Sequence, residues 1–343
     1  MSFPAPRFLF VPVYDSCNLR CPHCEFWRRP HTLNQTSWAD VDHRKRQQPI
    51  MREFATMNPE GTVVTHGGES LLNWEAYLTL TRYARNLGLR LLTVTNGSMI
   101  FSPEKAAEIV IDGPAEINVS LDSIHPEIHD KFRGATGAFD KAVRALRLLL
   151  EARARWGSNI KVNAILLVGK STYLELDEAY NFTLNKIGVD KLKLNMVQPS
   201  FGNNSGEDPF FAEESDVDPS LLGQVLFDVD VKHHLDFNPI WIRQITMYFR
   251  SIRANPKVRL GWNGDLNTFD HICNSYDRNI WLSDRSDMFL CCDSRWPGMV
   301  WEKPGDMRRF WEEAQELRSK MSSCNRLCGV SHSLRNTSAT LKR

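Results

Sequence analysis

Three cysteines fall within eight residues in the stretch Cys17-Asn18-Leu19-Arg20-Cys21-Pro22-His23-Cys24. This stretch directly follows an apolar segment, residues 7–13, that we interpret as a β-strand. Three thiolates at this spacing can wrap one metal centre. A structural zinc site takes four ligands, with His23 as the candidate fourth, whereas an iron–sulfur cluster held by three thiolates leaves one iron open to a substrate or cofactor. Coordination by His23, between two cysteines, would strain the loop, so we favour the cluster.

Outward from this stretch, the first 200 residues alternate between strand-like and helix-like patterns. We expect strands at 7–13, 61–65, 90–95, 116–121, 160–168 and 191–197, and helices at 74–86, 103–111, 139–154 and 172–187. Strands that alternate with helices indicate parallel βαβ units. Periodicity allows either an open doubly wound sheet or a partial barrel. In both folds the functional groups gather at the carboxyl ends of the strands.

The composition of the sequence changes after residue 198. Residues 199–219 are rich in glycine, asparagine, proline and acidic residues and are predicted to form a loop. Further helices are expected at 220–227, 239–253 and 308–322. We therefore divide the chain into a core (1–200), a linker with bridging helices (201–270), a small cysteine-rich domain (271–330) and a flexible tail (331–343).

The composition excludes several classes of protein. The 343 residues are 42% hydrophobic and 24% charged with a formal net charge of +1, so no overall field favours nucleic acid or an anionic membrane. The basic run 44–46 has acidic neighbours and is interpreted as a solvated face. No apolar run approaches the roughly 18 residues that cross a bilayer, and the N-terminus lacks the layout of a signal peptide. We expect a cytoplasmic protein.

The cysteine stretch after the first strand resembles the signature of the radical S-adenosylmethionine (SAM) superfamily, and later strand ends add to the likeness. Gly67-Gly68-Glu69 looks like the GGE segment of that family, with Ser70 where proline is usual. The resemblance assigns the Glu69 carboxylate to the ammonium group of SAM. Asn96, Ser120 and Asp122 stand where the family places polar contacts to SAM, with turn and capping roles as the alternative.

Two further segments carry weaker likenesses. Arg133-Gly134 resembles a segment that follows the fourth strand in many members, and Arg133 is a candidate either to bind a carboxylate or to fix the loop. Val168-Gly169, after the fifth strand, is a candidate to line the adenine pocket.

The resemblance covers about the first 200 residues and implies a partial (β/α)6 TIM-like barrel. It implies that Cys17, Cys21 and Cys24 hold a four-iron four-sulfur cluster whose open iron binds the amino and carboxylate groups of SAM. One electron would then cleave SAM into methionine and a 5′-deoxyadenosyl radical, which abstracts a hydrogen atom from the substrate. An external one-electron donor of the flavodoxin or ferredoxin type is the implied partner.

The other five cysteines lie in the last quarter of the chain, at Cys273, Cys291, Cys292, Cys324 and Cys328. Their layout resembles the SPASM/Twitch extensions of radical SAM enzymes, in which one cysteine precedes a hairpin, a second closes it and a pair follows a helix. The hairpin is expected at 281–283 and 287–290, with Ser286 where glycine is usual. The resemblance implies one auxiliary four-iron cluster on Cys273, Cys291, Cys324 and Cys328, and a closed zinc site is the alternative. Cys292 is then either a buried thiol or a hydrogen-atom donor, unless it replaces Cys291 as ligand.

The sequence is less informative about the substrate. Family analogues include sugar-alcohol dehydrogenases and enzymes that crosslink or oxidise ribosomal peptides. The first strand begins by residue 7, which leaves no room for the leader-binding domain of many peptide modifiers. We therefore expect oxidation of a small molecule such as a sugar or aminocyclitol, with crosslinking or epimerisation of a ribosomal peptide as the alternative. A non-enzymatic metal-binding module is a remote alternative, against which the GGE segment argues.

Several histidines and tryptophans are also candidates for the site. His31, His66, His233 and His234 are possible proton carriers, although a lone histidine is more often structural. His66 has more weight because it precedes Gly67 at a strand end. Four tryptophans either line a pocket or pack in the core: Trp241, Trp262, Trp281 and Trp296.

Overall fold

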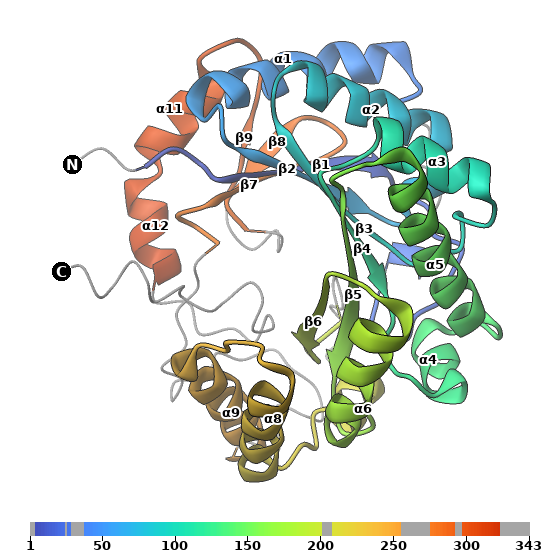
Figure 1. The fold of residues 1–343 in the computed structure, drawn as a ribbon. Helices are drawn as coiled ribbons and strands as arrows, with labels where there is room; N and C mark the ends of the chain where they lie inside the picture. The colour runs from blue at the N-terminus through green and yellow to red at the C-terminus, as the bar shows by residue number, and fades with distance from the viewer. Residues whose placement is uncertain are drawn as a thin grey trace.

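The computed structural model describes residues 4–24, 26–28, 38–200, 208–254, 275–291 and 297–322, and its centre is one nine-stranded sheet (Figure 1). The strand order is β6-β5-β4-β3-β2-β1-β7-β8-β9. The first six strands pair in parallel with their sequence neighbours: β1 (Phe8–Tyr14), β2 (Thr62–Gly67), β3 (Arg90–Thr95), β4 (Glu116–Ser120), β5 (Lys161–Val168) and β6 (Lys191–Met196). The sheet curves, with helices along its convex side, which confirms the predicted partial barrel.

The structure describes six α-helices in this half: α1 (Val41–Met57), α2 (Trp74–Asn86), α3 (Pro103–Asp112), α4 (Pro126–Arg133), α5 (Ala138–Trp156) and α6 (Leu176–Tyr180). Three of these six helices, α1, α2 and α3, begin at a residue whose side chain caps the first turn. Asn73 caps α2 by accepting from the backbone N–H of Ala76, and Ser102 caps α3 in front of Pro103. The helices predicted at 74–86, 103–111 and 139–154 are confirmed, with shifts of one or two residues at their ends.

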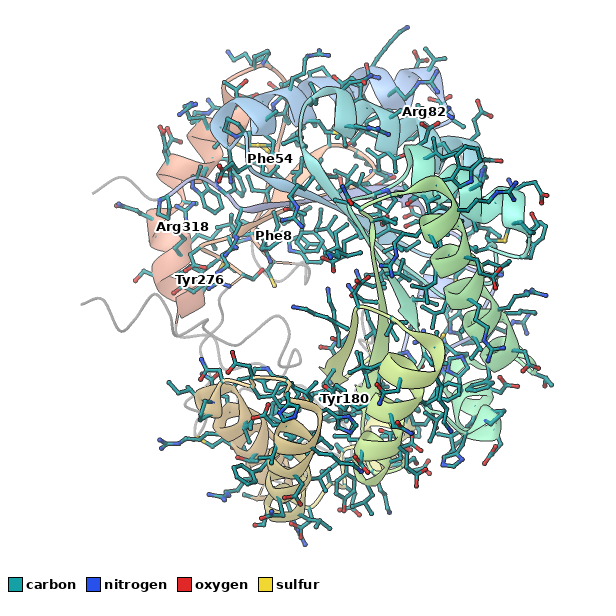
Figure 2. The ribbon with its side chains drawn as sticks, viewed as in Figure 1. Phe8, Phe54, Arg82, Tyr180, Tyr276 and Arg318 are labelled. Atoms are coloured by element: carbon teal, nitrogen blue, oxygen red, sulfur yellow. The ribbon has the colours of Figure 1, made fainter. Side chains whose placement is uncertain are left out.

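Helix α1 was not predicted from the sequence. Its buried face carries His43, Gln47, Ile50 and Phe54 at helical spacing, and Phe54 lies between α1 and the sheet (Figure 2). The charged run at 44–46 and Pro49 within the helix obscure this pattern. Lys45 and Arg46 are exposed, as a solvated face requires.

The helix predicted at 172–187 is observed over residues 173–187, although it is not a regular α-helix. It contains a 3-10 turn (Tyr173–Glu175), α6 and then a π-helical turn (Asn181–Ile187). The Thr183 hydroxyl donates to the carbonyl of Ala179 at 2.7 Å, and such a side-chain bond competes with the regular backbone ladder.

The loop predicted at 199–219 is also wrong in part, because α7 (Pro209–Glu214) lies within it. Asp208 starts this helix by accepting from the backbone N–H of Phe211 at 2.9 Å, with Pro209 in the first position. Helices α8 (Pro219–His233) and α9 (Pro239–Ala254) follow and contact each other, within the range 201–270 that the sequence analysis assigns to a linker with bridging helices. The Tyr248 hydroxyl of α9 donates to the carbonyl of Val197, just after β6, at 2.7 Å.

The C-terminal hairpin continues the core sheet. β7 (Asn279–Leu282) pairs in parallel with β1, and β8 (Asp287–Phe289) and β9 (Met299–Val300) follow in antiparallel order. The rings of Phe10 and Trp281 stack across β1 and β7 with centroids 3.5 Å apart. Ser286 has φ +73°, so the turn keeps the left-handed backbone that glycine usually supplies at this position.

The helix predicted at 308–322 is two helices, α11 (Asp306–Glu313) and α12 (Gln315–Ser322), which are separated at Ala314. Trp311 of α11 donates its indole N–H to the carbonyl of Pro4 at 2.9 Å, so the C-terminal helices are tied to the start of the chain. Among the helices that the structure describes, none is long and apolar enough to cross a membrane.

Replacing His43 by leucine is expected to raise the free energy of unfolding, most strongly at acidic pH. Within the described ranges neither ring nitrogen of this buried histidine has a hydrogen-bond partner, and leucine removes both polar atoms. Burial lowers the pKa of His43 from 6.5 to about 4. The unfolded chain therefore binds a proton first, and the wild type loses stability as the pH falls from 6.5 towards 4.

Urea denaturation at pH 7.5 and pH 5 measures this effect. The His43→Leu protein should lose less stability between the two pH values than the wild type, by about 1–2 kcal/mol. His234→Asn is the control, because His234 is exposed and holds a left-handed backbone conformation that asparagine tolerates. An unchanged pH dependence in His43→Leu would contradict the assignment.

Candidate functional site

The three N-terminal cysteines lie in a loop that leaves the carboxyl end of β1. We call residues 15–24 the cysteine loop. Burial raises the pKa of the Cys17 thiol to about 12, and the negative charges of Glu69, Cys21 and Cys24 also raise it. The three thiols are therefore close enough to influence one another, and a cationic centre would relieve their repulsion. Across the described ranges, no three His, Cys, Asp or Glu side chains are already gathered for coordination.

Gly67 and Gly68 hold the first half of the cysteine loop against the end of β2. The Gly68 N–H donates to the carbonyl of Tyr14, and the next N–H donates to the carbonyl of Ser16, both at 2.9 Å. A Cβ on Gly68 would lie 2.2 Å from the Ser16 oxygen, and one on Gly67, where φ is +116°, would lie 2.6 Å from the Tyr14 oxygen. Glycine is thus required here by the approach of the loop backbone.

Glu69 fastens the end of β2 to the end of β3. Its carboxylate accepts from the Leu71 N–H at 3.1 Å, the Thr95 hydroxyl at 2.7 Å and the Asn96 N–H at 2.8 Å. The side chain is buried, and burial raises its pKa. Both carboxylate oxygens have partners within the protein, so the geometry gives Glu69 a structural task beside its predicted contact with SAM.

Asn96 connects β3 to the cysteine loop. Its side-chain amide donates to Oδ1 of Asn18 at 3.0 Å, and its own Oδ1 accepts from the Ser98 N–H at 2.9 Å. The amide of Asn18 donates in turn to the hydroxyl of Ser98 at 2.8 Å. This three-residue ring fixes the loop between its first two cysteines.

Asp122 and Arg133 form a buried ion pair beneath the second half of the loop. Arg133 Nη2 donates to Asp122 Oδ1 at 2.7 Å, and Nε lies 2.6 Å from Oδ2. Burial opposes ionisation of Asp122, but the charge of Arg133 outweighs it and lowers the pKa of the carboxyl. The Cys21 thiol donates to the backbone carbonyl of Arg133 at 3.7 Å. At Gly134, φ is +60° and a Cβ would lie 2.2 Å from the carbonyl oxygen of Arg20.

Two features near this edge escaped the sequence analysis. His129 Nδ1 accepts from the backbone N–H of Asp122 at 3.1 Å, and the buried Glu214 of α7 accepts from the N–H and hydroxyl of Ser171 at 2.9 and 2.7 Å. A Cβ on Gly169 would lie 2.8 Å from the Glu214 carboxylate, so this glycine accommodates α7. Because residues 199–219 were predicted as a loop, helix α7 was missed and Glu214 was not identified as a candidate site residue. Ser120 is buried at the end of β4.

The candidate histidines fall into different places. His66 Nε2 lies 3.0 Å from the carbonyl oxygen of Leu282, and its ring meets the edge of Trp281. His233 pairs with Asp177 at 2.8 Å, and His234 is the exposed left-handed cap of α8. Of these, only His66 lies at the carboxyl edge of the sheet. His31 lies outside the described residues.

The remaining aromatic candidates pack within the fold. The ring centroids of His23 and Phe210 of α7 lie 5.2 Å apart, and burial lowers the pKa of His23 to about 4. Trp241 packs on Phe237 with ring centroids 4.9 Å apart. Trp262 and Trp296 belong to the ranges that the structure leaves undescribed.

Cys291 lies at the opposite end of the sheet from the cysteine loop. β8 runs antiparallel to β7, with Phe289 opposite Trp281, so the chain returns towards the amino end of β1 before it reaches Cys291. The Ser275 hydroxyl donates to the carbonyl of Leu290 at 2.9 Å and holds this end. The predicted partners and neighbour of Cys291 lie outside the described residues: Cys273, Cys292, Cys324 and Cys328.

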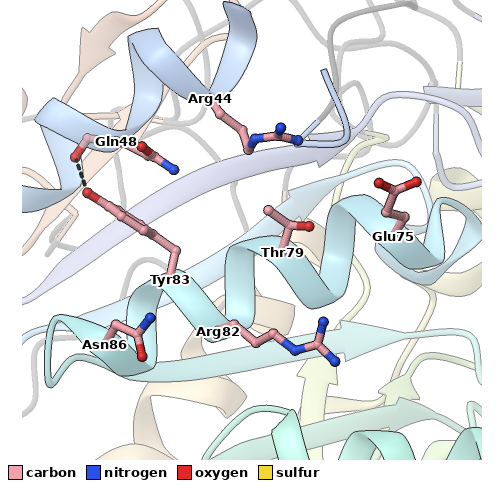
Figure 3. A pocket seen from close by; sticks show the side chains of 7 residues that line it. All are labelled: Arg44, Gln48, Glu75, Thr79, Arg82, Tyr83 and Asn86. Atoms are coloured by element: carbon pink, nitrogen blue, oxygen red, sulfur yellow. Dashed lines mark hydrogen bonds between the residues drawn. The ribbon is translucent and has the colours of Figure 1, made fainter. Parts of the chain in front are cut away.

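A pocket of about 340 Å³ lies between α1 and α2, on the helical side of the sheet (Figure 3). Arg44 donates to the carbonyls of Trp38 and Ala39, and the Tyr83 hydroxyl donates to the carbonyl of Gln48. These polar groups are engaged in holding α1, away from the strand ends. The pocket is lined by Arg44, Gln48, Glu75, Thr79, Arg82, Tyr83 and Asn86.

Comparison with known proteins places this edge in context. Residues 11–183 match the family model of the radical SAM superfamily. The AdoMet-dependent heme synthase of Oleidesulfovibrio alaskensis is 31% identical over 159 residues, which cover 46% of this chain and 39% of the synthase. The cysteine-type anaerobic sulfatase-maturating enzyme of Clostridium novyi is 25% identical over 183 residues, 51% of this chain and 46% of that enzyme. The chain spans less than half the length of either relative.

The likeness in fold extends over more of the chain. The structure of Streptococcus suis SuiB bound to precursor peptide SuiA matches with a TM-score of 0.64 at 14% identity. The match covers 94% of this chain and 68% of SuiB. The fold shared with SuiB thus includes the region beyond residue 200.

Gly134→Ala is expected to impair assembly of the metal centre, whereas Gly137→Ala should not. Both glycines have positive φ, so alanine costs about 1 kcal/mol of backbone strain at either. Only at Gly134 would the new Cβ collide with the carbonyl of Arg20; at Gly137 it meets nothing within 4 Å. Iron and sulfide content after anaerobic reconstitution measures the difference. Equal iron content in the two variants would refute the docking role of Gly134.

Arg133→Met is expected to lower the free energy of unfolding by about 3–5 kcal/mol, because it strands the buried charge of Asp122. The double variant Asp122→Leu/Arg133→Met leaves no unpaired charge and should recover most of this loss. Urea denaturation of the two variants beside the wild type tests the pair. A double variant as unstable as the single one would show that the loss has another origin.

Proposed function

The chain belongs to the radical SAM superfamily, and from this premise we propose that it is an enzyme that cleaves SAM reductively and abstracts a hydrogen atom from a peptide. The observation that carries the proposal is the docking of a three-thiol loop at the carboxyl edge of a partial barrel, within the range that matches the family. Members of this family bind a four-iron four-sulfur cluster and SAM. The chemistry of the site supports both groups here.

Cys17, Cys21 and Cys24 would hold the cluster. Burial and the charges of Cys21 and Cys24 raise the pKa of the Cys17 thiol, which suits a cationic iron centre, and three protein ligands leave one iron for SAM. When bound, the cluster and SAM supply a one-electron cleavage that yields methionine and a 5′-deoxyadenosyl radical, which takes a hydrogen atom from the substrate. An external flavodoxin- or ferredoxin-type donor would provide the electron.

The other residues at this edge divide into two roles. Gly67, Gly68 and Glu69 hold the loop and the strand ends, and the proposed SAM contacts of Glu69 would be made from this fixed position. Asn96 and Ser120 remain the proposed polar contacts to SAM. We assign Asp122 and Arg133 as positioning residues, since each binds the other beneath Cys21.

The proposed substrate is a peptide. The comparisons give no support to the expected sugar or aminocyclitol. A relative named as a sulfatase-maturating enzyme acts on a protein, and the structure that shares the fold over most of this chain holds a precursor peptide. The heme synthase relative favours a tetrapyrrole as the second candidate, through an identity that extends over less than half of either chain.

We also propose an auxiliary iron–sulfur cluster on Cys273, Cys291, Cys324 and Cys328, with zinc as the alternative metal. The hairpin that delivers Cys291 and the left-handed turn at Ser286 support this layout. Cys292 stays a proposed hydrogen-atom donor or an exchanged ligand.

Anaerobic reconstitution followed by a SAM assay with dithionite tests the proposal. The wild type should hold about eight irons per chain and form 5′-deoxyadenosine. The Cys17→Ser/Cys21→Ser/Cys24→Ser variant should keep about four irons and form none. Cys291→Ser is the matched control: it should lose iron from the auxiliary site and still cleave SAM. Formation of 5′-deoxyadenosine by the triple variant, or zinc as the sole metal of the wild type, would overturn the radical mechanism.

A further inference from the structure

The concave side of the sheet faces away from the helices and is exposed in part. Within β3, Thr93 is buried on the helical side, where its hydroxyl meets that of Tyr77 from α2 at 3.0 Å. Val94 points to the other side and is 40% exposed, although β3 lies between two hydrogen-bonded neighbours. Val94 is therefore accessible from within the barrel.

The strand register places several polar side chains of β4, β5 and β6 on this concave face. Val94 pairs with Asn118, and Asn118 with Asn163, so these residues share one face. Glu116 lies two residues before Asn118, and Lys193 lies two residues after the β6 partner of Asn163. Because side chains alternate along a strand, Glu116 and Lys193 belong to the same face.

These four side chains form one connected network. Asn163 donates from its amide to Glu116 at 3.2 Å and to Oδ1 of Asn118 at 3.1 Å, and Asn118 donates to the carbonyl of Thr93 at 3.2 Å. Lys193 Nζ pairs with the same Glu116 oxygen. The two asparagines are buried, while the side chain of Lys193 is 37% exposed and that of Glu116 17%. Within this network, the Lys193 ammonium group is therefore the more exposed partner, and the Glu116 carboxylate is the more buried one.

The opposite part of the concave face is aromatic. Phe10 pairs with Val64 of β2 and with Trp281 of β7, on which its ring stacks at 3.5 Å. His66 lies against the edge of Trp281. Figure 2 shows Phe8, which shares this face of β1, directed towards the space that the sheet partly encloses. A site with an apolar wall and a few convergent polar groups is typical of small-ligand and substrate pockets.

The position of Lys193 has a functional rather than a structural explanation. Barrel interiors are normally filled with branched apolar side chains, which cost no desolvation. Here Asn163, which also donates to Asn118, donates to Glu116, and Glu116 pairs with one lysine, whose ammonium group carries three N–H donors. Such a lysine is a point charge suited to a carboxylate or another anion.

Resting on the proposed function, we infer that Lys193 is a specificity-determining residue that binds a carboxylate of the peptide substrate on the concave face of the barrel. The carboxylate comes either from an acidic side chain or from a free C-terminus. Glu116 positions Lys193 and competes with the substrate for it, and the Phe10–Trp281 wall contacts the apolar part of the same substrate.

The test uses four synthetic libraries of random dodecapeptides, which carry either one glutamate or one glutamine at the centre and end in either a free acid or an amide. Retention on the reconstituted protein with SAM is measured by mass spectrometry. The wild type should retain the carboxylate-bearing library about tenfold better than its neutral counterpart. A preference for glutamate identifies a side chain, and a preference for the free acid identifies the C-terminus.

Three variants separate recognition from folding. Lys193→Met, and Glu116→Gln/Lys193→Met, which strands no carboxylate, should both lose the preference. Glu116→Gln should increase the preference for carboxylate-bearing peptides, because the Glu116 carboxylate no longer competes for Lys193. If the ion pair were merely structural, this variant should decrease the preference. Lys141→Met is the control, since Lys141 is exposed on α5, on the helical side of the sheet, and it should retain the preference and cleave SAM as the wild type does.

The outcomes distinguish the two proposals. Retention of peptides without preference for a carboxylate, or a preference that survives in the Glu116→Gln/Lys193→Met protein, overturns the role of Lys193 and leaves the peptide function intact. Failure of the wild type to retain any library overturns the peptide function and this inference with it, while 5′-deoxyadenosine formation reports separately on the radical chemistry.

Discussion

The close approach of two backbones at the carboxyl edge of the sheet is the constraint on which this structure depends. The cysteine loop lies against the end of β2 on one side and against the end of α4 on the other. At Gly68 and at Gly134 a single added carbon would lie 2.2 Å from a loop carbonyl oxygen. Backbone-to-backbone contacts of this kind leave little freedom in the position of the loop, because neither partner can rotate away. The location of the three thiols therefore follows from the positions of glycines that are distant in the sequence.

Buried charges reinforce the same contact. Glu69 and Asp122 are both carboxylates beneath the loop, but they are stabilised in different ways. Glu69 depends on N–H and O–H donors from β3 and the turn after β2, and its pKa is raised. Asp122 has the full charge of Arg133, and its pKa is lowered. Each group joins two elements near the loop, so the loop rests on a base crosslinked by polar contacts.

The core strands and most of the helices of this edge were predictable from sequence, while the contacts that shape it were not. β-Branched runs and helical spacing identified β3 and α2 with their observed ends. Helix α1 was missed because charges at 44–46 interrupt its apolar face, and α7 because proline and acidic residues usually indicate a loop. The GGE segment was identified as a cofactor contact, yet its glycines serve the loop backbone. Such close approaches join residues about 50 to 115 positions apart and leave no local pattern.

Parallel pairing of β7 with β1 makes the C-terminal hairpin part of the catalytic sheet. Strand register therefore determines where Cys291 lies relative to the cysteine loop. The seven residues of β1 span about 20 Å, so the cysteine loop and Cys291 lie near opposite ends of one strand. The stacked rings of Phe10 and Trp281 and the bond from His66 to Leu282 lie along this path. A substrate on the concave face would contact the Phe10–Trp281 pair, which lies between the two ends of β1. Because Trp281 belongs to the hairpin, a change in the position of the hairpin would move this contact.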